Sequence, residues 1–300
     1  MAYFKMKNFQ NKFFREAIYL YRLKENTNFI QQFVSSFYDY DNLYFVSKLY
    51  DGFITNYIND TWTENQLKFF SACLIQSFIA LRKEKLIHRD VHFNNLVLDE
   101  KQYIILIDFH IIMEYKDKND PKNNLIGSPE LCAPEMIKSS EYDYNSDYYR
   151  LGGMMYFCIF KKFPNYIKEE KNLSEISIDF NESKNFSYSC IDFINKLLIS
   201  NPKKRIGFDN IEELQNHEFF KNFNWNDLIN GRMKSPFSNI KIKDLGLCPT
   251  KFNKRKKIFM NNSFLKNKTF KNMFFLYNNI NSNIVNKIFN SFRYLDYFIN

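Results

Sequence analysis

Three short motifs follow one another in the chain and constrain its fold more than any other feature. The first reads His-Arg-Asp at 88–90 and is followed by Asn95; the second reads Asp-Phe-His at 108–110, and the third reads Ala-Pro-Glu at 133–135. Two short apolar runs separated by a polar turn lie between the first and second motifs, which predicts a pair of strands. One match of three residues would carry little information, but three matches in this order are specific.

The order and spacing of these motifs resemble the signature of the protein kinases. In that family the first motif supplies a catalytic base and a metal ligand, the second supplies the main magnesium carboxylate, and the third closes the activation segment. The resemblance implies that Asp90 is the base, that Asn95 and Asp108 bind Mg²⁺, and that ATP and Mg²⁺ are the cofactors. These residue types fit the chemistry, because phosphoryl transfer depends on positioning and charge neutralisation and Mg²⁺ prefers oxygen ligands.

Further segments resemble the AGC group of serine/threonine kinases, with a catalytic domain similar to that of the cAMP-dependent kinase. Residues 127–135 are similar to the GTPEYLAPE stretch of that group, with Ser128 keeping a hydroxyl in place of threonine. Residues 147–152 are similar to the D-x-W-x-L-G start of a central helix. There the aspartate, here Asp147, braces the catalytic loop.

Other single positions take structural roles from the same resemblance. Arg205 lies in the segment Asn-Pro-Lys-Lys-Arg-Ile-Gly, whose arginine pairs in the family with the glutamate of A-P-E, here Glu135. His88 stands at an ordinary core position of kinases. Arg89 is present without an obvious phosphate to bind, because Asn124 occupies the position of the activation-loop threonine.

The C-terminal part of the chain extends the resemblance almost to its end. It contains segments similar to the end of the large lobe, to the P-P-F that opens an AGC tail, and to the tail motif F-x-x-F, at 217–220, 224–228, 235–237 and 289–294. We therefore expect an α+β, bilobal protein-kinase-like fold with an incomplete small β-rich N-lobe and a mainly helical C-lobe. The expected kinase-like domain covers 1–237, with the N-lobe at about 1–48 and the C-lobe at about 49–237, and a basic AGC-type C-terminal tail covers 238–300.

The N-terminus departs from the family pattern. Kinases carry a glycine-rich strand–loop–strand over the phosphates before the strand with the phosphate-pairing lysine, but six residues precede Lys7 and none is glycine. Either the protein has no such lid or the reading frame omits a piece of it; the chain is expected to be N-terminally truncated and degenerate. Lys7 is the candidate phosphate-pairing lysine, Lys5 is the alternative, and Glu16 is the candidate partner on the next helix. A solvated strand lysine and a surface glutamate are the competing interpretation.

The catalytic cleft departs from the pattern at two positions. His92 stands where serine/threonine kinases carry a lysine after the catalytic aspartate, and His110 replaces the glycine of D-F-G. A neutral imidazole neutralises a transferred phosphate less well than an ammonium group, although a protonated one could partly substitute. His110 also removes a residue that adopts a positive φ at little cost. His88, His92 and His110 together invite a zinc hypothesis, which we disfavour because no ligand spacing supports it.

The positive charge of the chain is concentrated near its C-terminus, and this distribution bears on its partners. The formal charge of +9 equals that of residues 245–300, which hold ten of the 42 Lys and Arg residues and one of the 33 acidic residues. This basic stretch could bind nucleic acid, anionic lipid or an import receptor, but we favour a tail that wraps the small lobe. The five widely spaced cysteines are expected to be small buried hydrophobes. We expect no membrane span, no nucleic-acid partner, a monomer, and a cytoplasmic or nuclear location.

Hydrophobic periodicity predicts the main secondary structure. We expect helices at about 12–24, 63–83, 147–160, 187–199, 210–216 and 225–230, and strands at 3–7, about 30–38, 42–49, 96–98 and 103–107, with an irregular stretch at about 110–132. Thr63 is a plausible N-cap for the second helix.

The leading functional prediction is an ATP- and Mg²⁺-dependent serine/threonine protein kinase of reduced activity that acts on a protein substrate. A regulatory protein is a candidate second partner. Asp90, His92 and Asn95 form its catalytic set, while Lys7, Glu16 and Asp108 bind the cofactor. The alternative is a catalytically dead pseudokinase that acts as a binding or scaffold module.

Overall fold

Helix α2 (Glu64–Lys83) passes through the middle of the larger lobe in the computed structural model, which describes residues 15–38, 43–115, 129–138, 143–164 and 185–237. The expected N-cap is confirmed: the Thr63 hydroxyl accepts a hydrogen bond from Gln66 N at 3.2 Å, and the Gln66 side chain accepts one from Thr63 N at 2.8 Å. This reciprocal pair is a capping box. Leu67, Phe70, Leu74 and Phe78, which recur at helical spacing along α2, are buried.

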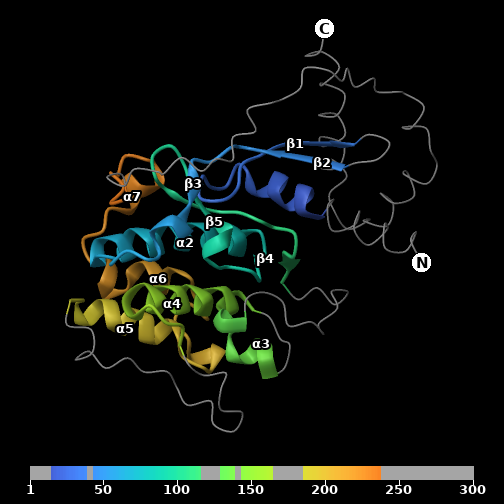
Figure 1. The fold of residues 1–300 in the computed structure, drawn as a ribbon. Helices are drawn as coiled ribbons and strands as arrows, with labels where there is room; N and C mark the ends of the chain where they lie inside the picture. The colour runs from blue at the N-terminus through green and yellow to red at the C-terminus, as the bar shows by residue number, and fades with distance from the viewer. Residues whose placement is uncertain (1–14, 39–42, 116–128, 139–142, 165–184, 238–300) are drawn as a thin grey trace, which may run out of the picture.

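The described part of the large lobe contains five further helices: α3 (Pro134–Lys138), α4 (Tyr144–Phe160), α5 (Tyr188–Leu197), α6 (Glu212–Asn216) and α7 (Trp225–Ile229). In Figure 1, α3 to α6 lie below α2, and α7 lies above it. The predicted helices are therefore present at their expected places, while α3 was not predicted. Gly152 allows α4 to approach α5 closely, because a Cβ atom at this position would lie 2.8 Å from Leu197 Cβ.

The small lobe consists of a helix that includes residues 15–23 and an antiparallel pair of strands, β1 (Phe33–Tyr38) and β2 (Leu43–Ser47). In Figure 1 the two strands lie side by side above this helix. The chain between the helix and β1 is attached to the large lobe, because Gln31 N donates to Leu106 O at 2.8 Å and Leu106 N donates to Phe29 O at 2.9 Å.

Two small β units of the large lobe pack against α2 and flank the segments that hold the cleft residues. Strands β3 (Gly52–Phe53), β5 (Leu96–Leu98) and β6 (Ile104–Leu106) form one antiparallel sheet, and the pair predicted around the polar turn is confirmed as β5 and β6. Strands β4 (Leu86–Ile87) and β7 (Met113–Glu114) form a separate antiparallel pair. The expectation of an irregular stretch at 110–132 missed β7, whose backbone bonds are made to β4 rather than to a sequence neighbour.

Short 3₁₀ helices complete the described elements: η1 (Ile54–Tyr57), η2 (Phe93–Asn95), η3 (Pro129–Leu131), η5 (Pro202–Lys204) and η6 (Glu218–Phe220). Cys73, Cys132, Cys158 and Cys190 are buried, as expected, while Cys248 lies outside the described residues. Within the described ranges, no helix combines the length and the hydropathy needed to cross a membrane. The predicted strand at 3–7, Lys7, Ser128 and the tail 238–300 also lie outside them.

Candidate active site

The loop that carries Asp90 is held from below by Asp147, which lies in the first turn of α4. Asp147 Oδ2 accepts a hydrogen bond from His88 N at 2.8 Å, and Oδ1 accepts one from Arg89 N at 3.0 Å. Arg89 has a φ of 71°, a left-handed conformation that costs about 1–3 kcal/mol for a residue with a side chain. Burial raises the pKa of Asp147 to about 6, while the two amides and Arg150 lower it. Asp147 therefore offsets strain in this loop, and it lies where the resemblance implied.

His88 is fully buried in its neutral form beneath the same loop. Its Nδ1 accepts a hydrogen bond from Asp90 N at 3.2 Å, and its Nε2 lies 3.2 Å from Ile107 O, to which it can only donate. The two bonds together fix the tautomer with the proton on Nε2. Burial lowers the pKa of His88 to about 4 against the opposing charges of Asp90 and Asp108. This imidazole is consequently a structural group that orients Asp90.

Asp90 has one carboxylate oxygen in use and one without a partner. Asn95 Nδ2 donates to Asp90 O at 3.0 Å and to Asp90 Oδ2 at 3.2 Å, and His92 Nε2 lies 3.4 Å from the same Oδ2. Asp90 Oδ1 is buried and has no hydrogen-bond partner among the described residues. Burial raises the pKa of Asp90, but the hydrogen bond from His92 and the charge of Arg150 are among the effects that lower it, and the net pKa lies below its usual value.

The hydrogen bonds of His92 define its form. Its Nδ1 accepts from Asn94 N at 3.2 Å, which leaves Nε2 as the protonated nitrogen that faces Asp90. A protonated imidazole would carry a hydrogen on Nδ1 and lose the bond from Asn94. This geometry therefore favours a neutral His92 that donates to Asp90, rather than the cation that could substitute for the missing lysine.

Asp108 is placed beside the second cleft histidine. Its backbone has a φ of 67°, and its N–H donates to Gln31 Oε1 at 3.1 Å, which ties it to the small lobe. Its Oδ1 pairs with His110 Nδ1, and the two side chains are 41% and 48% exposed. The hydrogen bond with His110 lowers the pKa of Asp108, and the same bond raises the pKa of His110. A hydrogen bond with His110 therefore occupies one oxygen of the expected magnesium carboxylate.

Glu16 lies on the small-lobe helix and faces Asp108 and the following residue. Burial and the negative charge of Asp108 raise the pKa of Glu16 to about 7, while a hydrogen bond from the Phe109 backbone and the charge of His110 lower it. Glu16 is thus drawn into the cleft, in contrast to a solvated surface glutamate. Lys7, its expected partner, lies outside the described residues.

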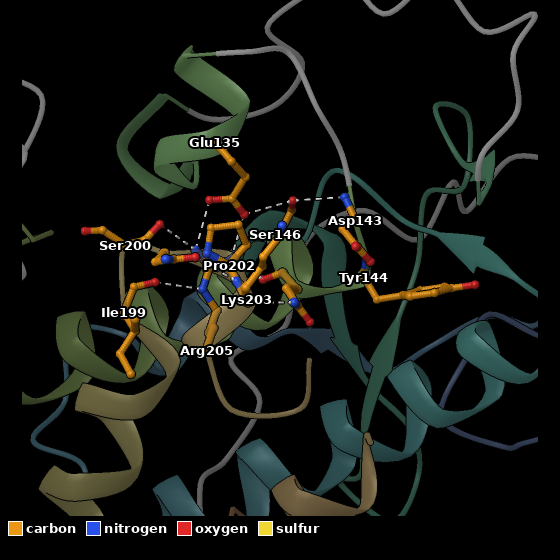
Figure 2. A network of polar contacts seen from close by, with 11 residues as sticks. Glu135, Asp143, Tyr144, Ser146, Ile199, Ser200, Pro202, Lys203 and Arg205 are labelled. Atoms are coloured by element: carbon orange, nitrogen blue, oxygen red, sulfur yellow. Dashed lines mark hydrogen bonds and ion pairs between the residues drawn. The ribbon is translucent and has the colours of Figure 1, made fainter. Parts of the chain in front are cut away.

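The pairing expected between Arg205 and Glu135 is present at the rear of the site and is shown in Figure 2. Arg205 Nη1 and Nη2 donate to the two carboxylate oxygens of Glu135 at 2.7 and 2.9 Å. Nη1 also donates to Asn145 O at 2.7 Å, and Nε donates to Ile199 O at 3.0 Å. Such bidentate, charge-assisted bonds are the strong ones in proteins. They join the A-P-E segment to the base of α4.

Two residues near the site were not predicted. Gln31 supplies the acceptor that holds Asp108, and Arg150, in α4, is fully buried with its Nη2 3.7 Å from Cys132 Sγ. The charge of Arg150 lowers the pKa of both Asp90 and Asp147. Arg150 occupies an unspecified position of D-x-W-x-L-G, one turn after Asp147, and this helical spacing is the signal that could have placed it beneath the loop.

The zinc hypothesis concerns the three cleft histidines. Each is engaged separately, His88 with backbone groups, His92 with Asp90 and His110 with Asp108. Within the described ranges, no group of three or more His, Cys, Asp or Glu side chains is arranged to hold a metal ion. The magnesium site that the resemblance implies for Asn95 and Asp108 would be of a different kind, because in kinases the phosphates complete the coordination of Mg²⁺.

Comparison with known proteins identifies the family. The model of the protein kinase domain matches residues 3–220, so the chain belongs to the protein kinase domain family. It is 30% identical over 208 residues to the serine/threonine-protein kinase sgk-1 of Caenorhabditis elegans, a match that covers 67% of this chain and 45% of the relative. It is 29% identical over 180 residues to the RAC serine/threonine-protein kinase of Drosophila melanogaster, covering 59% of this chain and 30% of the relative.

A third relative is the serine/threonine-protein kinase N2 of Danio rerio, 28% identical over 182 residues, with 59% of this chain and 19% of the relative covered. These matches confirm the assignment to the AGC group and the bilobal α+β fold. The chain spans less than half the length of these three curated relatives.

Proposed function

We propose that this chain transfers the γ-phosphoryl group of ATP to the hydroxyl of a serine or threonine in a protein substrate, at a reduced rate. The observation that carries the proposal is the buried, unpartnered Oδ1 of Asp90, an acceptor aligned by three hydrogen bonds around it. An unpartnered buried carboxylate oxygen is costly unless something binds there, and a substrate hydroxyl is a suitable donor.

The remaining polar groups fit an ATP–Mg²⁺ complex. Both bonds from Asn95 to Asp90 use Nδ2, so its side-chain oxygen stays available as a hard ligand. The backbone of Asn95 is joined to the residue before Asp108, because Ile107 N donates to Asn95 O at 2.9 Å. Bound Mg²⁺ would neutralise the phosphate charge. In this assignment Asp90 accepts the hydroxyl proton, His92 holds Asp90, Asn95 and Asp108 are the metal ligands, and Lys7 with Glu16 anchors the phosphates.

The structural roles complete the proposal. His88, Arg89 and Asp147 hold the catalytic loop, Glu135 and Arg205 hold the A-P-E segment, and Ser128 keeps the hydroxyl that the resemblance implies for its position. We assign residues 1–237 to the catalytic domain, divided near residue 48, and 238–300 to a tail that wraps the small lobe. We also propose a monomer in the cytoplasm or nucleus; the four described cysteines, which are buried thiols, suit a reducing compartment.

The proposal is tested with the purified chain and the variants Asp108→Ala and Asp90→Asn. Thermal shifts with ATP and Mg²⁺ measure binding, and transfer of labelled phosphate to a protein substrate measures turnover. We expect Asp108→Ala to abolish the Mg²⁺-dependent shift, and Asp90→Asn to keep the shift but to lower transfer by about a thousandfold, since it removes the hydroxyl acceptor.

Asp209→Asn, an exposed aspartate away from the cleft, is the matched control and should behave as the unchanged chain. Nucleotide binding without any transfer by the unchanged chain would overturn the catalytic proposal and favour the scaffold alternative. No Mg²⁺-dependent binding at millimolar ATP would overturn the assignment of the metal ligands as well.

A further inference from the structure

The small-lobe helix that carries Glu16 is fastened to the large lobe by Arg22. Its Nε and Nη2 donate to Glu84 Oε2 at 3.2 and 3.1 Å, and Nη2 also donates to Glu84 O at 3.1 Å. Its Nη1 donates to Glu114 Oε1 at 3.0 Å. One guanidinium group thus makes four hydrogen bonds to residues 62 and 92 positions away in the sequence.

The two glutamates belong to the parts of the large lobe that frame the cleft. Glu84 is the C-cap of α2, the central helix of the described core. Glu114 lies in β7, four residues after the Asp-Phe-His motif ends, and β7 pairs with β4, which leads into His88. Arg22 therefore connects the helix of Glu16 both to the fixed core and to the segments that carry the expected metal ligand and the expected base.

Neighbouring side chains close this connection into a network. Asn26 Nδ2 donates to Glu84 Oε1 and to Arg22 O, each at 3.1 Å, and Lys83 Nζ donates to Asn26 Oδ1 at 3.2 Å. Both oxygens of Glu84 are consequently in use. The segments that carry the two glutamates are also joined by their backbones, because Tyr115 N donates to Lys85 O at 2.7 Å.

Partial burial makes these contacts stronger than an ordinary surface ion pair. The side chains of Arg22 and Glu84 are 20% and 24% exposed, and that of Glu114 is 44% exposed. Exposed ion pairs contribute little, but partly desolvated arginine–carboxylate forks are stronger and fix orientation. In contrast, Lys24, which directly follows this helix, lies 3.8 Å from the carboxylate of Glu25, which is 83% exposed, and 4.2 Å from the centre of the Tyr21 ring.

Helix geometry places Arg22 and Glu16 on different sides of the same rod. Six residues correspond to about 9 Å along the axis and about 120° around it, so that one side chain can hold the helix while the other faces the cleft. A helix is stiff over this length. Release of Arg22 would therefore let the Glu16 end move away from Asp108.

We propose that Arg22 is a positioning residue that locks this helix against Glu84 and Glu114 and keeps Glu16 beside Asp108. The proposal rests on the proposed kinase function. Arg22 connects the helix to the large lobe by a permanent ion pair. In the AGC group this connection depends on phosphorylation of the activation segment, and the position of that phosphate is Asn124 in this chain. The chain is thus expected to need no activation-segment phosphate to place Glu16.

The test compares Arg22→Ala, Arg22→Lys and Glu114→Gln in the full chain, with Lys24→Ala as the matched control. Amide hydrogen exchange measures local opening of the helix, and steady-state transfer separates kcat from KM. For Arg22→Ala we expect exchange in residues 17–23 to rise by about tenfold while the amides of α4 and α5 stay protected. We expect kcat to fall by about tenfold with a smaller change in the KM of the protein substrate.

Arg22→Lys, which keeps the charge but loses the fork, should restore part of both effects, and Glu114→Gln should show a weaker version of them. Exchange in Arg22→Ala that matches Lys24→Ala would overturn the proposal. Faster exchange throughout α4 and α5 would also overturn it, because the role would then be general stability. If the unchanged chain transfers no phosphate, the kinase function fails, and the exchange data still decide whether Arg22 locks the helix.

Discussion

The charged groups behind the catalytic loop differ from those of the catalytic cleft in how they are paired. We call the first set, Arg205, Glu135 and Asp147, the frame. In the frame, the fully buried Arg205 faces Glu135, which is 10% exposed, and Asp147 receives two backbone amides. In the cleft, Asp90 and Asp108 are each paired with an imidazole, and the Asp108–His110 pair is about half exposed. The charged groups of the frame are bound to other buried groups of the protein, whereas a ligand could replace the partners of the charged groups in the cleft.

This difference separates stability from chemistry in this molecule. Contacts such as those of Arg205 are made by groups that no substrate reaches, so they support the fold whether or not phosphate is transferred. The carboxylates of the cleft keep partners that can be displaced, and one oxygen of Asp90 has no hydrogen-bond partner among the residues that the structure describes. Variants in the frame should therefore change unfolding, and variants in the cleft should change binding and turnover.

The largest effect is expected from Arg205→Ala, which breaks the frame. It would leave the carboxylate of Glu135 without its buried partner, and loss of one member of such a pair costs about 3–5 kcal/mol in the free energy of unfolding. Chemical denaturation of the unchanged chain and the variant measures this difference. Arg232→Ala removes an exposed pair with Asp227 and should cost less than about 1 kcal/mol.

If Arg205→Ala does not fold, Glu135→Gln provides a milder version, because it keeps an acceptor for Arg205 while it removes the charge. A loss below about 1 kcal/mol in both variants would contradict the assignment of this pair to the frame, since such a value is typical of surface pairs.

The second effect concerns His88, where frame and cleft meet. Its pKa is about 4 in the folded chain, against an ordinary value of 6.5, because the ring is buried. Between these values the unfolded chain binds more protons than the folded chain, so stability is lost as the pH falls from about 6.5 to about 4. The loss from this group is at most about 3 kcal/mol, at 1.36 kcal/mol per unit.

Denaturation measured at several pH values checks this prediction, with His88→Phe as the comparison. The phenyl ring keeps the shape but does not titrate, so the variant should lose less stability than the unchanged chain over the same pH range. An equal loss in both chains would contradict the role of His88, and would attribute the acid sensitivity to other groups.

The frame could be predicted from the sequence more fully than the cleft. Periodicity and the N-cap at Thr63 predicted α2, and the matched segment around Arg205 indicated its pairing with Glu135, because local pattern and motif spacing specify such features. His92 and His110 were identified as departures from the kinase pattern. Their pairing with Asp90 and Asp108 depends on side-chain geometry, which spacing does not contain.

Contacts between distant segments were the least predictable. The partners of Arg22 lie 62 and 92 residues away, and no local pattern connects the three positions. The full burial of Arg150 also follows from the packing of α4 beneath the catalytic loop rather than from its residue type. Arginine is rarely fully buried unless it is paired, so composition alone would have placed it at the surface.

The smallest of these effects, and the one that sharpens the comparison, is expected from His110→Gly. The variant removes the imidazole that holds Asp108 Oδ1; the positive φ in this motif belongs to Asp108 and not to His110, so the loss of the imidazole is the main change. Because Mg²⁺ must compete with His110 for this oxygen, we expect the Mg²⁺ concentration for half-maximal nucleotide binding to fall by about tenfold, equivalent to about 1.4 kcal/mol. The free energy of unfolding should change by less than about 1 kcal/mol, since the pair is half exposed.

A titration with Mg²⁺ at fixed ATP, followed by thermal shift, measures this change, and a parallel titration with Mn²⁺ tests the opposite possibility. If His110 instead acts as a nitrogen ligand beside Asp108, its removal would weaken Mn²⁺ binding more than Mg²⁺ binding, because imidazole suits transition metals. Unchanged half-maximal concentrations for both metals would show that the pair with His110 is not part of the metal equilibrium. The cleft would then resemble the frame in keeping its charged groups permanently paired.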